Sequence, residues 1–323
     1  MIEVLFGDLD MEKAYEIALK LPEMDEVEIS AILAGLELKG YNAEIIAGFS
    51  RAILERVRLE LGRVFDTCGT GGDLSSTINV STAVAIAVSL FTPVAKHGNR
   101  AVSSKSGSAD VLERLGVRIE QPAEVARRMI RETNFAFLFA PLYHSSFAKV
   151  AGVRRRLKIR TIFNVLGPLV NPANPERQII GVSSEKLLLP VAETLNLLGR
   201  KGIVIYGNGI DEVNPNAETT AYIVEDGIEK LKLKPEDFGL RECRIVPCRD
   251  SEDSARRIRA IFADSGLEED RNLIAINFAT ALYALGFEDL KENVAIFNEK
   301  IEKKEFLRKL EEIVCKSTNT SIQ

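Results

Sequence analysis

Residues 63 to 73 read Arg-Val-Phe-Asp-Thr-Cys-Gly-Thr-Gly-Gly-Asp, at the point where a predicted strand passes toward a predicted helix. Gly69, Gly71 and Gly72 fall within four positions of this stretch. Because glycine has no Cβ, backbone N–H groups at such a turn can face an anion and approach it closely. The following helix adds unpaired N–H groups and a partial positive charge. The stretch therefore predicts a phosphate-binding turn at the end of a strand in an α/β protein.

This turn matches neither of the two commoner phosphate-binding motifs. A P-loop continues with Lys and then Ser or Thr after its last glycine, whereas here Asp73 follows Gly72. The dinucleotide-binding motif needs a third glycine at a spacing that is absent here. A carboxylate at Asp73 would repel a phosphate unless a cation or a sugar hydroxyl lay between them. We therefore expect metal ions or sugar hydroxyls in the site; an ordinary glycine turn before a helix is the simpler alternative.

Two polar segments that follow are predicted to lie at the same end of the sheet. Residues 79–82 read Asn-Val-Ser-Thr, in which Ser81 or Thr82 is a natural helix N-cap whose hydroxyl can instead face a phosphate or a metal. Residues 93–100 read as a short strand that delivers polar side chains, and another helix opens within residues 103–110. Such loops gather at the carboxyl ends of strands in open α/β sheets, where ligands bind.

Two charged groups later in the chain each have two interpretations. Arg154, Arg155 and Arg156 form a basic triplet on a predicted helix, which is most often a solvated face. Asp211 and Glu212 follow a predicted strand and a turn, where both carboxylates can reach one hydrated cation; a solvated acidic turn is the alternative. Mg²⁺ prefers oxygen ligands, and one or two carboxylates plus phosphates commonly bind it. With a phosphate turn across the sheet edge, the metal interpretation is favoured.

Six segments, in this order and spacing, resemble the anthranilate phosphoribosyltransferase family, and the similarity covers nearly the whole chain. They are Asp-Thr-Cys-Gly-Thr-Gly-Gly-Asp (66–73), Asn-Val-Ser-Thr (79–82), Lys-His-Gly-Asn-Arg (96–100), Ser-Gly-Ser-Ala-Asp (106–110), Arg-Thr-Ile-Phe-Asn-Val-Leu-Gly-Pro-Leu-Val-Asn-Pro (160–172) and Asp-Glu (211–212). The resemblance implies a glycosyltransferase of tryptophan biosynthesis. Such an enzyme transfers the phosphoribosyl group of 5-phosphoribosyl 1-diphosphate (PRPP) to the amino group of anthranilate, giving N-(5-phosphoribosyl)anthranilate and diphosphate.

The resemblance also implies the residues of the site. Those expected to bind PRPP are Gly69, Thr70, Gly71, Gly72, Asp73, Asn79, Ser81, Thr82, Lys96 and Ser108. Those expected to bind anthranilate are Gly69, His97, Asn99, Arg154, Gly167 and Pro168. Arg154 aligns with the arginine that holds the anthranilate carboxylate, a task that suits the planar fork of a guanidinium. Ser81, Asp211 and Glu212 are expected to hold Mg²⁺, with two ions per active site.

The chain has only two histidines, and no residue is assigned as an acid or base catalyst. His97 is either a general base or a residue that shapes the anthranilate pocket by packing and hydrogen bonding. We favour the second role, because an aryl amine is already a nucleophile with an available lone pair. His144 begins a segment that reads His-Ser-Ser-Phe where family members usually continue His-Pro-Ala-Met, so its role stays open.

The predicted fold is a small N-terminal helical domain and a large α/β domain with a mostly parallel central sheet. Helices without a strand are predicted at residues 11–21, 26–38 and 42–58, with Asp10 as the first N-cap. From Val64 onward strands and helices alternate. We expect the domains to span residues 1–62, completed by helices near 142–163, and residues 63–323. In the resembling family the helical domain forms much of a homodimer interface.

The composition limits which classes of partner the protein is expected to bind and in which cellular compartment it is expected to lie. A chain of 323 residues can bury a large core, and its net charge of -5 argues against general affinity for polyanions such as nucleic acids. The four cysteines are scattered, and Cys243 and Cys248 lack zinc-ligand spacing. Since no signal peptide or long apolar span is evident, we expect a cytoplasmic protein with no membrane partner.

Three other functions fit part of the sequence. Pyrimidine nucleoside phosphorylases share the expected architecture, but their lysine-serine signature differs from the Lys-His-Gly-Asn of residues 96–99. A non-catalytic relative that binds nucleic acid through a basic groove conflicts with the acidic net charge and with Asp211 and Glu212. A purely structural helical dimer accounts for residues 1–62 and for nothing after them.

Overall fold

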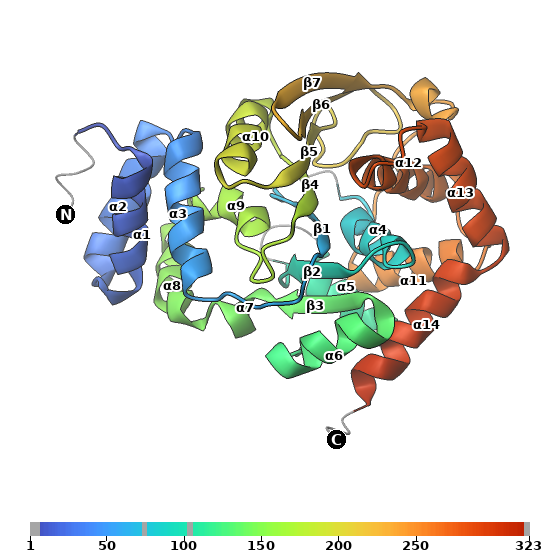
Figure 1. Cartoon of the computed structure of the whole chain (residues 1–323), viewed down its shortest axis with the longest axis horizontal. Helices are drawn as coiled ribbons and strands as arrows, with labels where there is room; N and C mark the ends of the chain where they lie inside the picture. Colours follow the sequence, from blue (N-terminus) through green and yellow to red (C-terminus); the bar gives the residue numbers. More distant parts are fainter. Residues whose placement is uncertain (1–6, 73–75, 102–105, 320–323) are drawn as a thin grey trace.

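The computed structural model describes residues 7–72, 76–101 and 106–319 (Figure 1). Asp73, predicted to bind PRPP, lies outside these ranges. A seven-stranded sheet crosses the middle of the molecule in the order β3-β2-β1-β4-β5-β6-β7. The strands are β1 (Phe65–Gly69), β2 (Val94–Gly98), β3 (Phe135–Phe139), β4 (Arg177–Gly181), β5 (Lys201–Tyr206), β6 (Thr219–Val224) and β7 (Ile228–Leu233).

The sheet is parallel from β3 to β5, and β6 and β7 add two antiparallel strands at one edge. This confirms the predicted mostly parallel sheet. Gly69 at the end of β1 pairs with Gly181 at the end of β4, and Gly98 ends β2 beside Phe139 of β3. The carboxyl ends of four neighbouring strands therefore meet at one edge, where ligands bind in open α/β sheets.

Helices cover both faces of the sheet and extend beyond one side of it (Figure 1). The longer helices are α1 (Met11–Lys20), α2 (Glu26–Lys39), α3 (Ala43–Glu55), α4 (Val80–Val88), α5 (Ser108–Leu115), α6 (Ala123–Thr133), α8 (Ala148–Leu157), α10 (Leu188–Leu197), α11 (Ser251–Phe262), α12 (Glu268–Ala284), α13 (Leu290–Glu302) and α14 (Glu305–Thr318). The short ones are η2 (Leu21–Glu23), α7 (Ala140–Tyr143), η3 (Ser145–Phe147), α9 (Phe163–Leu166), η4 (Gly167–Leu169), η5 (Glu185–Leu187) and η6 (Pro235–Phe238).

The first three helices begin at side chains that cap them. The Asp10 carboxylate accepts a hydrogen bond from Lys13 N–H, Asp25 forms a capping box with Glu28, and Asn42 accepts from Ile45 N–H. Each cap satisfies an N–H group that the helix itself leaves unpaired. These starts agree with the sequence-based prediction. Helix α3, however, ends at Glu55 and not near residue 58, because its last turn tightens into i→i+3 hydrogen bonds.

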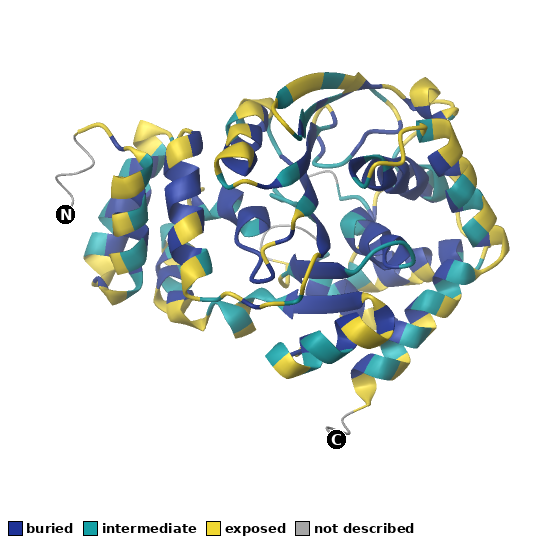
Figure 2. Ribbon diagram, in the orientation of Figure 1, coloured by how far each residue is buried: buried dark blue, intermediate teal, exposed yellow. Residues whose placement is uncertain are grey.

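Two clusters of buried apolar side chains lie on opposite faces of the sheet. Alternate strand residues enter different clusters: Ile203 packs with helices α4, α5, α6 and α11 to α14, whereas Val204 packs with α1, α2, α3, α8 and α10. Figure 2 shows the central strands buried on both faces, as parallel strands in α/β proteins are. Among the described residues, no helix combines the length and the apolarity needed to cross a membrane.

Candidate active site

The glycine turn leaves the end of β1 and is tied to β4. Thr70 N–H donates to the Gly181 carbonyl over 2.8 Å, and the Thr70 hydroxyl accepts from Ser183 N–H over 3.0 Å. Gly71 and Gly72 have φ angles of +63° and +80°, a backbone conformation that favours glycine. The turn is thus held at the carboxyl edge of the sheet with a shape that side chains disfavour.

The carboxylate of Asp211 lies inside this turn. Gly71 N–H donates to Asp211 Oδ2 over 2.8 Å, and a Cβ at Gly69 would overlap the same carboxylate. A Cβ at Gly181 would overlap the Asp211 backbone. The Gly71 N–H group therefore binds a carboxylate of the chain itself, and a contact of the turn with phosphate stays a prediction. Asp211 can lie against two strand ends only because both end in glycine.

Glu212 turns toward the segment that precedes α4. Its Oε1 accepts a hydrogen bond from the Thr77 hydroxyl over 3.2 Å. Asp211 and Glu212 thus follow β5 and contact two parts of the connection between β1 and α4, at Gly71 and at Thr77. The described residues contain no group of three or more His, Cys, Asp or Glu side chains placed to hold a metal ion. Two carboxylates fit a hydrated Mg²⁺ that takes its remaining ligands from water and phosphate.

Asn79 is the N-cap of helix α4, which begins at Val80; this corrects the prediction that Ser81 or Thr82 is the N-cap. The Asn79 side-chain oxygen accepts from Thr82 N–H over 3.2 Å, and its Nδ2 donates to the Ser106 carbonyl over 3.1 Å. Both predicted caps lie in the first turn of the helix. Thr82 is fully buried, whereas Ser81 is partly exposed. Asn79 is the N-cap because its side chain reaches the N–H group three residues ahead.

Lys96 lies in the interior, beneath the end of β1. Its ammonium group donates to the Thr67 carbonyl over 2.8 Å and to the Ser81 hydroxyl over 3.2 Å, and the residue is only 1% exposed. Burial lowers its pKa. Nearby, burial raises the pKa of Asp66 to about 6, while Asn171 donates to the Asp66 carboxylate over 2.8 Å. Lys96 therefore reaches the site through Ser81.

Ser108 and Asn99 join the end of β2 to the start of α5. The Asn99 carbonyl accepts from Ala109 N–H over 3.1 Å and from the Ser108 hydroxyl over 3.3 Å. A Cβ at Gly98 would overlap the Ser108 hydroxyl. The structure thus brings a residue expected to bind PRPP against one expected to bind anthranilate.

The two histidines form a buried pair. His97 Nδ1 lies 3.1 Å from the Gly167 carbonyl, and His97 Nε2 lies 3.2 Å from His144 Nε2. Because a carbonyl only accepts, His97 Nδ1 carries the proton and its Nε2 accepts from His144. Burial lowers the pKa of His97 to about 3 and that of His144 to about 4. Both His97 nitrogens are occupied, which favours pocket shaping over base catalysis.

The backbone of η4 is fixed by side chains that sequence reasoning missed. Gln178 on β4 donates to the Pro168 carbonyl over 3.0 Å, and Arg200 donates to the Leu169 carbonyl over 3.0 Å. The two side chains also bond each other over 3.3 Å. Burial lowers the pKa of Arg200 to about 10. Nothing in the sequence distinguishes these residues, because they act through contacts between distant segments.

Arg154 is held in a defined orientation on α8. Its Nε donates to the Thr161 hydroxyl over 3.1 Å, its Nη2 donates to Asn164 over 3.4 Å, and its guanidinium lies over the Phe163 ring. Burial lowers its pKa. Arg155 and Arg156 are exposed. The triplet thus contains one arginine positioned by three side chains and two at the surface.

Arg160 is a further basic residue that the predictions did not single out. Its Nη2 donates to the Ser183 hydroxyl over 3.2 Å, and its Nη1 lies 3.6 Å from the position of a Cβ on Gly72. It therefore places an exposed positive charge beside the glycine turn. The only signal for it in the sequence is its position as the first residue of the 160–172 segment.

Comparison with known proteins identifies the family of the chain. Residues 61–304 match the family described as "Glycosyl transferase family, a/b domain". The chain is 48% identical over 313 residues to anthranilate phosphoribosyltransferase of Pyrococcus furiosus, covering 96% of each protein. It is 66% identical to the tryptophan biosynthesis protein TrpCD of Archaeoglobus fulgidus, covering 99% of this chain but only 58% of that longer protein.

A solved structure agrees with this similarity. Anthranilate phosphoribosyltransferase from Saccharomyces cerevisiae in complex with PRPP and Mg superposes with a TM-score of 0.90 at 27% identity, covering 98% of this chain and 96% of that one. The similarity in sequence and in fold extends across nearly the whole chain. The chain therefore belongs to the anthranilate phosphoribosyltransferase family.

Proposed function

We propose that this chain transfers the phosphoribosyl group of PRPP to the amino group of anthranilate, giving N-(5-phosphoribosyl)anthranilate and diphosphate in tryptophan biosynthesis. The observation that carries the proposal is the anion-binding glycine turn, in which Gly71 N–H binds the Asp211 carboxylate at the carboxyl edge of the sheet. Relatives at 48% identity that share the full length of the chain bear the name of this enzyme.

We assign PRPP to the half of the site around β1 and α4. The glycine turn contacts the diphosphate through N–H groups other than those of Thr70 and Gly71, which bind the Gly181 carbonyl and the Asp211 carboxylate. Arg160 lies beside the turn, and Asp73, outside the described residues, stays a predicted contact. Asn79 and Ser81 contact phosphate oxygens directly. Lys96 and Thr82 act from the interior, since Lys96 donates to the Ser81 hydroxyl and Thr82 N–H anchors the Asn79 cap. Ser108 adds a hydroxyl at the start of α5.

Mg²⁺ fits the oxygen ligands that the chain supplies. The yeast relative contains Mg together with PRPP, and we propose two ions per active site with Asp211, Glu212 and Ser81 as protein ligands. When bound, the ions neutralise charge on the departing diphosphate. Asp211 already lies against the N–H group of Gly71. Asp211 would hold Mg²⁺ from this position, and the ion would supply positive charge near the diphosphate.

We assign anthranilate to the half of the site around α8 and η4. Arg154 binds the carboxylate of anthranilate, because its guanidinium is half-buried and oriented by three neighbouring side chains. Gly167 and Pro168 form one wall, and Gly69 and Asn99 border PRPP. The paired, neutral His97 forms the other wall without removing a proton. This arrangement holds the amine in line with the ribose.

Catalysis then rests on placement and charge. The C–O bond to diphosphate breaks as the anthranilate nitrogen attacks the anomeric carbon, through a transition state with oxocarbenium character. Holding two substrates in line removes much of the entropic barrier to reaction. The N–H groups of the glycine turn stabilise negative charge on the leaving group. The amine loses its proton as the new bond forms, and the departing diphosphate or water accepts it, since no residue of the chain is assigned that role.

We further propose a domain boundary and a homodimer. Residues 1–62, completed by helices near 142–163, form the helical domain, since α8 and α9 share a buried cluster with α1 to α3. On α2, Val27 is 77% exposed and Leu38 is 90% exposed. Ala31 and Ala34 lie on the same face between them. A second copy of this chain would cover this apolar face.

A cytoplasmic location is also part of the proposal. The four cysteines are all unpaired, as is usual for proteins of the reducing cytoplasm.

A fluorescence assay tests the proposed function. Anthranilate fluorescence should fall only when PRPP and Mg²⁺ are both present, and chelation should stop the fall. Uridine or thymidine with phosphate serves as the comparison for a nucleoside phosphorylase. Phosphorolysis of either nucleoside, with no loss of anthranilate, would reject the proposal.

A further inference from the structure

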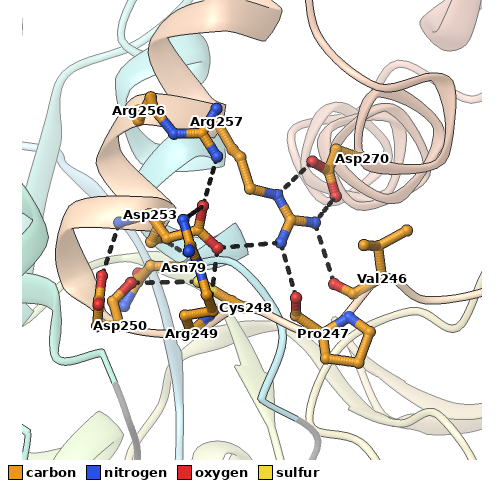
Figure 3. A network of polar contacts seen from close by, with 11 residues as sticks. Asn79, Val246, Pro247, Cys248, Arg249, Asp250, Asp253, Arg256, Arg257 and Asp270 are labelled. Carbon is orange, nitrogen blue, oxygen red and sulfur yellow. Dashed lines mark hydrogen bonds and ion pairs between the residues drawn. The ribbon is translucent and has the colours of Figure 1, made fainter.

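A buried cluster of charged residues lies behind the PRPP half of the site (Figure 3). It consists of Arg257 and Asp253 on α11 and of Asp270 on α12, which are 5%, 6% and 2% exposed. Arg257 Nε donates to Asp270 over 2.7 Å, Arg257 Nη2 bonds the other Asp270 oxygen, and Nη1 lies 3.6 Å from Asp253. We call these three residues the Arg257 cluster. The two carboxylates compensate the buried positive charge.

The remaining donors of Arg257 hold a segment without regular structure. Its Nη2 donates to the Val246 carbonyl and its Nη1 to the Pro247 carbonyl, each over 3.0 Å, as Figure 3 shows. The next residue, Cys248, donates its N–H to the Ser76 carbonyl over 2.6 Å. The guanidinium therefore fixes a strap, residues 246–248, that contacts the chain between the glycine turn and α4.

The same helix makes a second contact with that part of the chain. The Ser254 hydroxyl on α11 accepts a hydrogen bond from Asn79 N–H over 2.8 Å. Asn79 in turn caps α4, which carries Ser81 in its first turn. Ser76 and Asn79 are thus both held by elements that the Arg257 cluster braces. The described contacts of Arg257 include none with Arg154, His97 or Gly167.

We propose that the Arg257 cluster, acting through Ser254 and the strap 246–248, is a positioning element for the PRPP half of the site and not for the anthranilate half. The proposal rests on the proposed function, because it takes Asn79 and Ser81 as contacts of PRPP. None of the three residues is assigned a contact with substrate. The cluster sets where Asn79 and Ser81 lie, and its loss shifts those groups relative to the diphosphate.

Two substitutions test the cluster: one removes a single hydrogen bond to Asn79, and the other removes several hydrogen bonds of the guanidinium. Ser254→Ala removes only the acceptor of Asn79 N–H, and Arg257→Lys keeps a positive charge but loses the fork that bridges four partners. The matched control is Arg271→Gln on α12, which removes a partly exposed ion pair with Asp264 in the connection between α11 and α12. The measurements are the KM of each substrate, the dissociation constant of magnesium diphosphate by calorimetry, and Tm.

For Ser254→Ala we expect the KM of PRPP and the dissociation constant of magnesium diphosphate to rise about three- to tenfold, the effect of one hydrogen bond. The KM of anthranilate at saturating PRPP should change less than twofold. Arg257→Lys should show the same split with a larger rise, and Arg271→Gln should show none. If Arg257→Lys does not fold, Ser254→Ala alone tests the proposed positioning role.

Equal rises in both KM values, or unchanged diphosphate binding in Ser254→Ala, would overturn the proposal. Failure of the proposed function gives a different result, because the wild type would bind magnesium diphosphate without consuming anthranilate. In that case the dissociation constants of magnesium diphosphate still test the role of the cluster. The constant should rise in Ser254→Ala and stay unchanged in Arg271→Gln. Absence of diphosphate binding in the wild type would overturn both.

Discussion

The PRPP half of the site is built around a backbone turn, whereas the anthranilate half is built around side chains that other side chains hold. In the first, Thr70 N–H ties the turn to the Gly181 carbonyl, Gly71 N–H binds the Asp211 carboxylate, and Asp211 fits only because neighbouring strands end in glycine. In the second, Arg154 and His97 come from elements far apart in sequence and are oriented by contacts with other segments. Activity with PRPP should therefore fall when a Cβ is added to the first half. The affinity for anthranilate should fall when a supporting side chain is removed from the second half.

The largest expected effect comes from adding a Cβ to the backbone half. In Gly69→Ala the new Cβ would overlap the Asp211 carboxylate, so either that carboxylate or the turn must move and their contact is lost. Overpacking of 1–3 kcal/mol predicts a loss on the order of 100-fold in kcat/KM for PRPP. Steady-state kinetics measure it, with Gly227→Ala as the control, because a Cβ there meets nothing within 4 Å. Activity of Gly69→Ala close to the wild type would contradict the description of the turn.

Removal of the oriented guanidinium should affect the other half. Arg154→Ala should raise the KM of anthranilate about 30-fold, the value of a charge-assisted hydrogen bond, and leave the KM of PRPP within twofold. Arg155→Ala, an exposed neighbour on the same helix, should change neither. Equal effects on both substrates would remove Arg154 from the carboxylate role.

A substitution behind η4 should give a smaller effect of the same kind. Gln178→Leu leaves the Pro168 carbonyl without its donor and Arg200 without one acceptor. Unsatisfied buried groups of this kind cost about 1–3 kcal/mol, so the free energy of unfolding should fall by that amount. The KM of anthranilate should rise severalfold. Denaturant unfolding together with kinetics checks both. A stable variant with an unchanged KM would show that η4 does not depend on Gln178.

The smallest expected effect concerns pH. Burial lowers the pKa values of His97 and His144 to about 3 and about 4 from an ordinary value of 6.5. The folded state therefore binds fewer protons than the unfolded state, and the stabilisation present above pH 6.5 is lost as the pH falls toward these values. His144→Phe should flatten this dependence in Tm measurements between pH 7.5 and 4.5. An equally steep dependence in the variant would contradict the buried pair.

Sequence patterns predicted the helix starts and strand ends, which depend on residues close together in the chain. Asp10, Asp25 and Asn42 cap their helices because the N–H groups they satisfy lie two or three residues away. The strand ends at Gly69 and Gly98 follow in the same way, since apolar runs and glycine turns are local signals. The mostly parallel sheet then follows from the alternation of strands and helices.

Sequence patterns could not predict what depends on contacts between distant segments. The hydroxyl that accepts from the Asn79 backbone belongs to Ser254, on a helix far away in the sequence. Whether Lys96 points into solvent or into the interior depends on β1 beside it. Gln178, Arg200 and Arg257 carry no motif, and each gains its role only when a buried carbonyl from another element meets it.

Calorimetric titration of PRPP into the protein, with and without Mg²⁺, tests most directly whether the glycine turn and the carboxylates of Asp211 and Glu212 form one diphosphate site. We predict strong binding with Mg²⁺, weak binding after chelation, and loss of the Mg²⁺ dependence in Asp211→Asn. Binding of equal strength with and without Mg²⁺ in the wild type would contradict this account of the site.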